Sequence, residues 1–510
     1  MGAARKARMA RKARMVSVLT AAVLAGSLAL GVGGCGNREA ATGAAKEADE
    51  AAGNTAGGTA AESVEKSMTG TGSAETPIAG SAAGAAGEPP AGLAGGAAAD
   101  AALAELPSRY DSREHGRTSP VKNQGDLGTC WAFASLLALE SSLLPEESLD
   151  LSEDHMSHDP YFQLGQEGGG DYIMSMAYLL SWRGPVTEAQ DPYGDGVSPE
   201  GLDAVKHVKA IYLLPKQDRQ AIKQAVLESG GVQSALYTAL EGGTGDSRYY
   251  DQETGAYYYE GDAAPNHDVV IVGWDDDFPK ERFALEPPGD GAFLCENSWG
   301  TEFGLDGFFY VSYYDGNLGK VNLQYARAED PEPYDRIYQT DACGWLGQAG
   351  YGSETAWAVN VYTAGGTEEI LEEVGFYTTL PDSGYEVYLL REVPEDPELG
   401  EGGSFSKRSL VASGRRRFAG YDTVLLDEPV RLSPGERFGV MVKLTTPGAV
   451  HPIAIEYDPG DGRCRIDLSD GEGYLSPDGV RWERAEETQG SNVCLKAYTW
   501  AGPEMQYERN

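Results

Sequence analysis

Residues 120–134 decide the fold, and they read Pro-Val-Lys-Asn-Gln-Gly-Asp-Leu-Gly-Thr-Cys-Trp-Ala-Phe-Ala. A loop that contains glycine runs into Cys130, and an apolar stretch follows from Trp131 to about Leu144. Apolar side chains fall on nearly every face of a helix over this stretch, so we expect a buried helix that Pro145 ends. Cys130 therefore lies at the N-terminus of a buried helix.

The predicted position of Cys130 favours an ionised thiol. The helix dipole and the unpaired backbone N–H groups at a helix N-terminus lower the pKa of a thiol. A cysteine at a helix start is more often structural than catalytic, so a catalytic role requires partners elsewhere in the chain.

Two later motifs supply such partners. His267 precedes the run Val-Val-Ile-Val at 269–272, which predicts a buried strand. Asn297 begins Asn-Ser-Trp-Gly, shortly after another apolar strand at 291–294. A nucleophilic cysteine needs a base to take its proton, and the imidazole of that base needs a third group to orient it.

Gln124 adds an oxyanion-stabilising group. It lies six residues before Cys130, so its side-chain N–H can lie beside the backbone N–H of Cys130. Two such donors would stabilise a tetrahedral oxyanion by about 3 kcal/mol each.

The motifs Gln-Gly-x-x-x-x-Cys-Trp-Ala-Phe, Asn-His-x-Val and Asn-Ser-Trp-Gly, in this order, resemble the papain family of cysteine proteases over residues 106–326. The resemblance implies an α+β domain of two lobes, one helical and one rich in strands, with a cleft between them. It implies that Cys130 is the nucleophile, that His267 is the general base and acid, and that Asn297 orients the imidazole, with no cofactor.

The resemblance also predicts the residues that bind substrate: Gly169, Gly170, Tyr172, Asn266 and Trp299. The pair Gly169-Gly170 resembles the stretch that pairs with the substrate main chain in this family, and Tyr172 is expected near the side-chain pocket. Trp299 is expected to shield the hydrogen bond between His267 and Asn297 from water.

Two departures from the family pattern leave this set intact. Leu127 stands where the family usually has a disulfide-bonded cysteine. The connection from His267 to Asn297 is longer than usual and includes the aspartates at 275–277. These aspartates could bind Ca²⁺, although a solvated turn is the simpler interpretation.

We predict no metal site. His155 and His158 have a spacing that a metal site on a helix allows, but the sequence specifies no third ligand.

The N-terminal part has the pattern of an exported lipoprotein. Residues 1–35 combine a basic segment, an apolar stretch and a Cys35 that follows small residues, which resembles a lipoprotein signal peptide with Cys35 as the lipidation site. Ordinary cleavage nearby, with Cys35 incidental, is the alternative. Residues 36–105 are rich in Ala and Gly and predict a disordered tether. We therefore expect a protein at the cell surface, on the extracellular side of the membrane, which it contacts only through this anchor.

Residues 327–505 predict a second module. Short strands separated by turns indicate a β-sandwich, and stretches at 420–424 and 452–456 resemble the lectin-like domain that follows papain-type peptidases in some bacterial surface proteins. This module could bind carbohydrate through aromatic side chains, or it could dock a surface ligand or substrate. The candidate aromatic residues are Trp345, Tyr351 and Trp357. At most one pair can form among the three cysteines of this module, which are Cys343, Cys464 and Cys494.

Composition restricts the partners. The chain of 510 residues has 40 basic and 79 acidic side chains and a formal net charge of −39. Such a surface does not favour nucleic acid as a partner. The resemblance implies protein or peptide substrates, and we expect a monomer.

Three functions remain open. The first is an extracellular cysteine endopeptidase, the second is an inactive surface adhesin or carbohydrate-binding protein, and the third is a transpeptidase or peptidoglycan-directed hydrolase with the same triad. The complete catalytic set favours the first, because loss of activity usually removes the nucleophile or the base.

Overall fold

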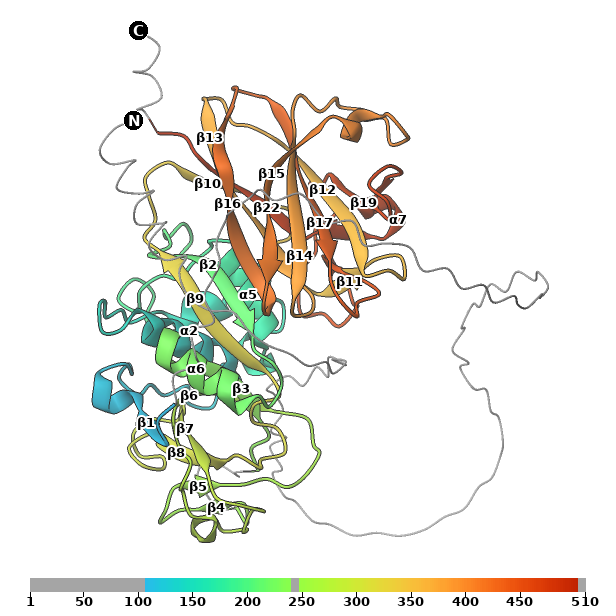
Figure 1. Ribbon diagram of the computed structural model, residues 1–510. Coiled ribbons are helices and arrows are strands. Elements are labelled where there is room, and N and C mark those ends of the chain that lie inside the picture. The colour runs from blue at the N-terminus through green and yellow to red at the C-terminus, as the bar shows by residue number, and fades with distance from the viewer. Residues whose placement is uncertain (1–105, 240–246, 503–510) are drawn as a thin grey trace, which may run out of the picture. The chain divides into compact units, whose positions relative to one another are not determined.

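A computed structural model describes residues 106–239 and 247–502 (Figure 1). The described residues belong to one compact unit. They confirm an α+β fold in which a helical lobe and a strand-rich lobe are followed by a β-rich module. The predicted signal peptide, Cys35 and the tether lie outside the described residues.

Helix α2 (Cys130–Leu143) is the buried helix of the first lobe. Its first twelve residues, from Cys130 to Ser141, are all buried, as its apolar pattern predicts. The backbone of Leu144 is extended, with φ −75° and ψ 147°, because a residue before proline is disfavoured in the helical region. The helix therefore ends one residue before Leu144, close to the predicted end.

Three further helices begin at a side chain that caps their first turn. They are α3 (Glu153–Ser157) after Ser152, α5 (Tyr172–Leu180) after Asp171 and α6 (Arg219–Ser229) after Asp218. A single turn, α4 (Gly165–Gly168), precedes α5.

Strand β6 (His267–Asp275) is central to the second lobe, and its residues 269–274 are buried. It pairs antiparallel with β3 (Val232–Leu236) and β7 (Ala292–Glu296), and β7 pairs with β8 (Phe308–Ser312). The start of β6 lies beside the end of β7, since Val270 is opposite Glu296. His267 and Asn297 therefore lie at the same edge of the sheet, although thirty residues separate them.

The sheet of the second lobe continues into the C-terminal module without a break. Strand β2 (His207–Leu213) pairs on one side with β9 (Asn322–Glu329) and on the other with β16 (Ala419–Leu432). Beyond β16 the sheet order continues through β13 (Glu369–Thr378), β22 (Leu495–Trp500) and β10 (Asp335–Tyr338). The predicted boundary between residues 326 and 327 falls inside β9, so the two modules share one sheet.

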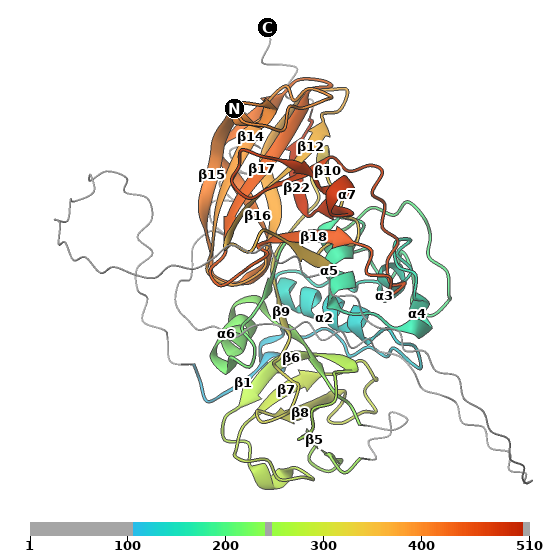
Figure 2. The same ribbon diagram turned by 90° about the vertical axis from the view of Figure 1, so that its right-hand side faces the viewer.

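A second sheet lies only in the C-terminal module (Figure 2). Its order is β15 (Arg408–Arg416), β14 (Ser383–Leu390), β17 (Arg437–Thr445), β12 (Thr355–Thr363), β19 (Gly473–Ser476) and β20 (Glu483–Arg484). Side chains from this sheet, such as Val387 and Val440, share one core with Val374 and Leu495 of the first sheet. Two sheets that share an apolar core are the packing of a β-sandwich.

The remaining elements are short. They are β1 (Arg109–Asp111), η1 (Ser112–His115), β4 (Tyr250–Asp251), β5 (Ala256–Tyr257), η2 (Lys280–Arg282), β11 (Gly347–Ala349), η3 (Ser404–Ser406), β18 (Ile453–Tyr457), α7 (Ala485–Thr488) and β21 (Ser491–Val493). Within residues 106–239 and 247–502, none of the helices has the length and apolar character needed to span a membrane.

Candidate active site

Cys130 is the first residue of α2 and is fully buried. The side chain of Thr129, the residue before it, does not cap the helix; its Oγ1 lies 2.7 Å from the hydroxyl of Tyr193 instead. A nucleophilic thiolate requires the reduced form, so a thiol reductant belongs in every activity measurement.

His267 and Asn297 form the hydrogen bond that the sequence predicts. Nε2 of His267 lies 2.7 Å from Oδ1 of Asn297, and the N–H of Ser298 donates to the same oxygen at 2.8 Å. An amide oxygen only accepts, so Nε2 carries the proton and Nδ1 is the basic nitrogen. Helix α2 packs against β6, the strand that His267 begins.

Burial lowers the pKa of His267 to about 4, because the imidazolium loses its hydration, and the hydrogen bond to Asn297 opposes this only in part. An adjacent thiolate would raise this pKa, since opposite charges favour each other's ionised form. The isolated imidazole is therefore neutral at pH 7 and able to accept a proton.

Trp299 covers this pair. Its ring lies 4.6 Å from the imidazole of His267, centroid to centroid, with 32° between the planes. The indole therefore packs against the imidazole of His267, and its predicted role in shielding the hydrogen bond from water stays a prediction.

Asn266 is bound within the protein. Its Oδ1 accepts from the N–H of Thr238 at 2.7 Å, and its Nδ2 donates to the carbonyl of Thr238 at 3.2 Å. These bonds tie the residue before His267 to the end of β3. Its predicted contact with substrate stays a prediction.

Gln124 is held on both ends of its side-chain amide. Ser298 Oγ donates to Oε1 at 2.6 Å, and Nε2 donates to the carbonyl of Leu127 at 2.7 Å. The backbone N–H of Gln124 also donates to the carbonyl of Ser298 at 2.8 Å. An amide nitrogen has two protons, so the second N–H of Nε2 is available to an oxyanion.

The Gly169-Gly170 stretch packs against the residue that follows Cys130. A Cβ at Gly170 would lie 2.5 Å from the indole of Trp131, and Gly169 has φ +80°. Both positions therefore require glycine, one for space and one for its backbone conformation. Tyr172, two residues later, is half-buried, and burial raises the pKa of its phenol.

Two residues that lie in motifs of the sequence, but to which sequence reasoning gave no role, support this site. Tyr193 donates from its hydroxyl to the carbonyl of Gln124 at 3.0 Å, and its ring packs edge-on against Phe133 at 4.8 Å. Ser298 holds Gln124, as described above. Ser298 lies beside Asn297 in the sequence and could have been noticed, whereas Tyr193 belongs to a loop that only the fold brings here.

Asp268, next to His267, is a third missed residue. Gln233 Nε2 donates to its Oδ2 at 2.9 Å. Burial, together with the nearby carboxylate of Asp171, raises the pKa of Asp268 to about 7, although the hydrogen bond from Gln233 opposes the rise. An acidic group that titrates near neutrality therefore directly follows His267 in the chain.

Several residues that were considered as metal ligands and set aside have other partners. His155 Nδ1 lies 2.7 Å from the hydroxyl of Tyr178, and Asp276 pairs with Lys223 and Tyr313. Over the described ranges, the one acidic group compact enough for a cation is Asp154, Asp191 and Asp195, with ligand atoms within 4.8 Å. His158 adjoins it, with Nδ1 3.9 Å from Asp154.

The aromatics proposed for sugar binding differ in exposure. Trp357 is a core residue, 8% exposed, under the guanidinium of Arg408, so a sugar-stacking role for Trp357 is wrong. Trp345 is half-buried and packs near Tyr377. Tyr351 is exposed and donates to Glu483 at 2.7 Å.

Two family models match the chain. Residues 106–326 match the papain family cysteine protease model, and residues 337–499 match the lectin-like domain model. The chain has a papain-family domain followed by a lectin-like domain. The papain-family domain holds every candidate catalytic residue, and the lectin-like domain includes most of the sandwich.

Curated relatives resemble the papain-family domain. Cathepsin S from Bos taurus is 29% identical over 221 residues, which are 42% of this chain and 62% of that protein. Procathepsin L from Rattus norvegicus is 28% identical over 223 residues, 41% of this chain and 61% of that protein. The chain thus spans about three fifths of the length of these relatives.

Solved structures resemble both domains together. The clostridial cysteine protease Cwp84 after propeptide cleavage has a TM-score of 0.69 and 27% identity, covering 77% of this chain and 99% of that one. The cysteine protease and lectin-like domains of Cwp84, a surface layer associated protein of Clostridium difficile, give a TM-score of 0.68 and 26% identity, covering 78% and 90%. Papain-family and lectin-like domains therefore also occur together in a bacterial protein.

Proposed function

We propose that the chain is a cysteine endopeptidase that hydrolyses peptide bonds through a covalent acyl-enzyme on Cys130. The observation that carries the proposal is the 2.7 Å hydrogen bond from Nε2 of His267 to Asn297. It leaves Nδ1 of a buried, neutral imidazole as the base, on a strand that packs against the helix of Cys130. The papain-family match over residues 106–326 supports the same chemistry.

Catalysis begins when Nδ1 of His267 takes the proton of Cys130. The thiolate attacks the substrate carbonyl carbon, and the carbonyl oxygen becomes an oxyanion that Nε2 of Gln124 and the backbone N–H of Cys130 stabilise. The C–N bond then breaks, and the imidazolium gives its proton to the leaving amine. A thioester on Cys130 remains.

Hydrolysis of the thioester reverses these roles. His267 takes a proton from water, the resulting hydroxide attacks the acyl carbon, and the C–S bond breaks. The carboxylic acid leaves and Cys130 is regenerated. Asn297 keeps the imidazole in one tautomer throughout, so no step requires a cofactor.

We propose that the enzyme acts at the cell surface, held by a lipid on Cys35. The signal-peptide pattern of residues 1–35 supports export, and the similar clostridial protein is described as surface layer associated. Nearby proteins and peptides are then the accessible substrates. Binding of carbohydrate by the lectin-like domain is untested, and docking of a surface ligand or substrate stays the alternative.

The proposal is tested with the full chain, reduced with a thiol, and a Cys130→Ala variant as the matched control. Both proteins are treated with an epoxide that alkylates nucleophilic thiols, the adduct is located by mass spectrometry, and turnover is measured on a mixed peptide library. A single adduct on Cys130, with library cleavage lost in Cys130→Ala, is the expected result.

A folded wild-type protein that neither reacts nor cleaves would contradict the proposal and favour the inactive adhesin. Products joined to an added amine acceptor, in place of hydrolysed ones, would favour the transpeptidase. Glycan arrays and peptidoglycan fragments test these alternatives directly.

A further inference from the structure

The N-terminus of α5 holds a contact between the two domains. Oδ1 of Asp171 caps the helix and accepts from the N–H groups of Ile173 at 2.9 Å and Met174 at 3.4 Å. Oδ2 of the same carboxylate forms an ion pair with Arg463 of the lectin-like domain. The two side chains are 12% and 17% exposed, so water screens this pair only in part.

Arg463 is fixed in place by its own segment. Its carbonyl accepts from the N–H of Gln163 at 2.9 Å, and the N–H of Arg465 donates to the carbonyl of Tyr161 at 2.8 Å. Residues 463–465 therefore pair with residues 161–163 as a short β-bridge between the domains. Asp461 Oδ2 accepts from Nε of Arg463 at 2.7 Å and aims the guanidinium.

This contact lies next to the catalytic helix. Phe162, at the centre of the bridge, packs edge-on against Trp131 with ring centroids 5.9 Å apart. Trp131 follows Cys130, and its indole leaves no room for a Cβ at Gly170. The indole of Trp131, at the start of α2, therefore contacts both the Gly169-Gly170 stretch and the β-bridge to the lectin-like domain.

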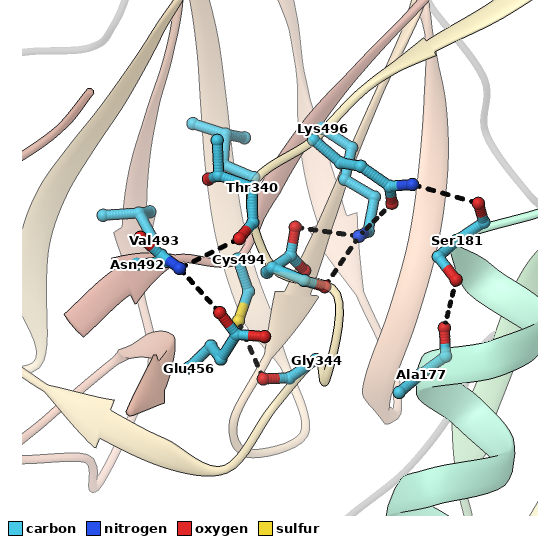
Figure 3. A network of polar contacts seen from close by, with 12 residues as sticks. Ala177, Ser181, Thr340, Gly344, Glu456, Asn492, Val493, Cys494 and Lys496 are labelled. Atoms are coloured by element: carbon cyan, nitrogen blue, oxygen red, sulfur yellow. Dashed lines mark hydrogen bonds and ion pairs between the residues drawn. The ribbon is translucent and has the colours of Figure 1, made fainter. Parts of the chain in front are cut away.

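The lectin-like domain also holds the other end of α5, as Figure 3 shows. The carbonyl of Ser181, the C-cap residue, accepts from Nε2 of Gln339 at 3.0 Å. Nζ of Lys496 donates to Oε1 of Gln339 at 2.7 Å and to Oδ1 of Asp341 at 2.8 Å. Lys496 and Asp341 are 1% and 0% exposed, so this end is fixed by a buried network.

We infer that Arg463 is a positioning residue for substrate binding: through Asp171 it fixes the start of α5 and the Gly169-Gly170 stretch before it. The lectin-like domain would then be part of the structure that sets substrate affinity, whatever else it binds. The inference rests on the proposed function, because the resemblance to papain-type peptidases implies that Gly169-Gly170 pairs with the substrate main chain. Loss of Arg463 would leave a charge on Asp171 without its partner and let the helix start shift.

The test compares Arg463→Ala, Asp171→Asn and the double variant in the full chain. Asparagine caps a helix as well as aspartate does, so Asp171→Asn removes the ion pair and keeps the cap. Arg481→Ala is the matched control, because Arg481 pairs with Asp478 within the lectin-like domain. Arg463→Lys tests rescue by a cation that cannot reproduce the fork of the guanidinium.

Each single variant should raise KM roughly tenfold while kcat stays within about twofold, since misplaced binding groups weaken association first. The double variant should be no worse than either single one, Arg463→Lys should recover part of the loss, and Arg481→Ala should match wild type. An unchanged KM, a loss confined to kcat, or additive effects of the two variants would overturn the inference.

A second measurement does not depend on activity. Hydrogen exchange at the amides of Ile173 and Met174 should be faster in Arg463→Ala than in wild type and in Arg481→Ala. If the wild-type protein neither cleaves nor reacts with the epoxide, the proposed function fails. Hydrogen exchange then tests by itself whether Arg463 fixes the start of α5. Equal protection of these amides in all three proteins would show that Arg463 does not fix the start of α5.

Discussion

Oδ1 of Asn297 accepts two hydrogen bonds, one of them from Nε2 of His267 at 2.7 Å. The other comes from the N–H of Ser298 at 2.8 Å, which holds the amide in one orientation. This arrangement sets which nitrogen of His267 is protonated. The base is consequently Nδ1, and removal of Asn297 would affect the tautomer and the ring orientation together.

We expect Asn297→Ala to lower kcat/KM about 100-fold, because the imidazole then loses its fixed tautomer while thiol and base remain. Asn297→Asp should keep the acceptor and add a negative charge that favours the imidazolium. The acid limb of kcat/KM against pH should therefore move to higher pH in Asn297→Asp. A limb at the same pH in both wild type and Asn297→Asp would show that this residue does not control the titration of His267.

The hydrogen bond from Ser298 to Gln124 makes a second prediction. Gln124→Ala should lower kcat by about 100-fold with little change in KM, since an oxyanion donor acts only in the transition state. Ser298→Ala keeps the donor but frees its orientation, so we expect a smaller loss of about tenfold. The measurement is steady-state kinetics on one peptide. Equal losses in the two variants, or a loss confined to KM, would contradict the assignment of Gln124.

The sequence points to the candidate catalytic set because each of its members lies in a local pattern. Cys130 begins an apolar helix, and His267 and Asn297 adjoin short buried strands whose antiparallel pairing brings them together. Tyr193 and Arg463 carry no such signal, because neither adjoins a strand or helix that predicts where it packs. Their roles come from loops placed by tertiary contacts.

The limits of the fold prediction have the same cause. The two-lobed domain and the sandwich follow from apolar patterns, which are local. The pairing of β16 with β2 joins residues 419–422 to residues 210–213, and no local pattern specifies such a partner. The sequence left the role of Trp357 open for a related reason, since an aromatic residue in a strand has the same pattern whether it faces solvent or the core.

The thiols should differ sharply in reactivity. Burial raises the pKa of Cys295 and Cys494, and the hydrogen bond from Cys343 to Cys464 raises that of Cys343. The start of α2 favours the thiolate of Cys130. After reduction, brief alkylation of the native protein at pH 7 should modify Cys130 and leave these three unmodified.

The alkylation is read by peptide mapping, with the unfolded protein as the control in which all these cysteines react. Labelling of Cys295 or Cys494 at the rate of Cys130 in the folded protein would contradict the expected order. Retained labelling at Cys130 in His267→Ala, at a reduced rate, would show how much of the reactivity depends on the imidazole.

Glu296, the last residue of β7, makes stability depend on pH. It is 2% exposed, its Oε1 has no hydrogen-bond partner among the described residues, and burial raises its pKa from 4.5 to about 8. Between these values the folded state keeps the proton while the unfolded state loses it. The contribution of Glu296 to the free energy of unfolding is therefore complete at low pH and is lost as the pH rises towards 8.

Glu296→Gln removes this titration and keeps the shape of the side chain. The variant should gain stability over wild type by up to about 1.4 kcal/mol per pH unit above pH 4.5, or roughly 4 kcal/mol near pH 8. Denaturant unfolding at pH 5, 6.5 and 8 measures the difference, with the exposed Glu302→Gln as the control. A difference that stays constant over this range would mean that Glu296 ionises alike in both states and that its burial has no energetic consequence.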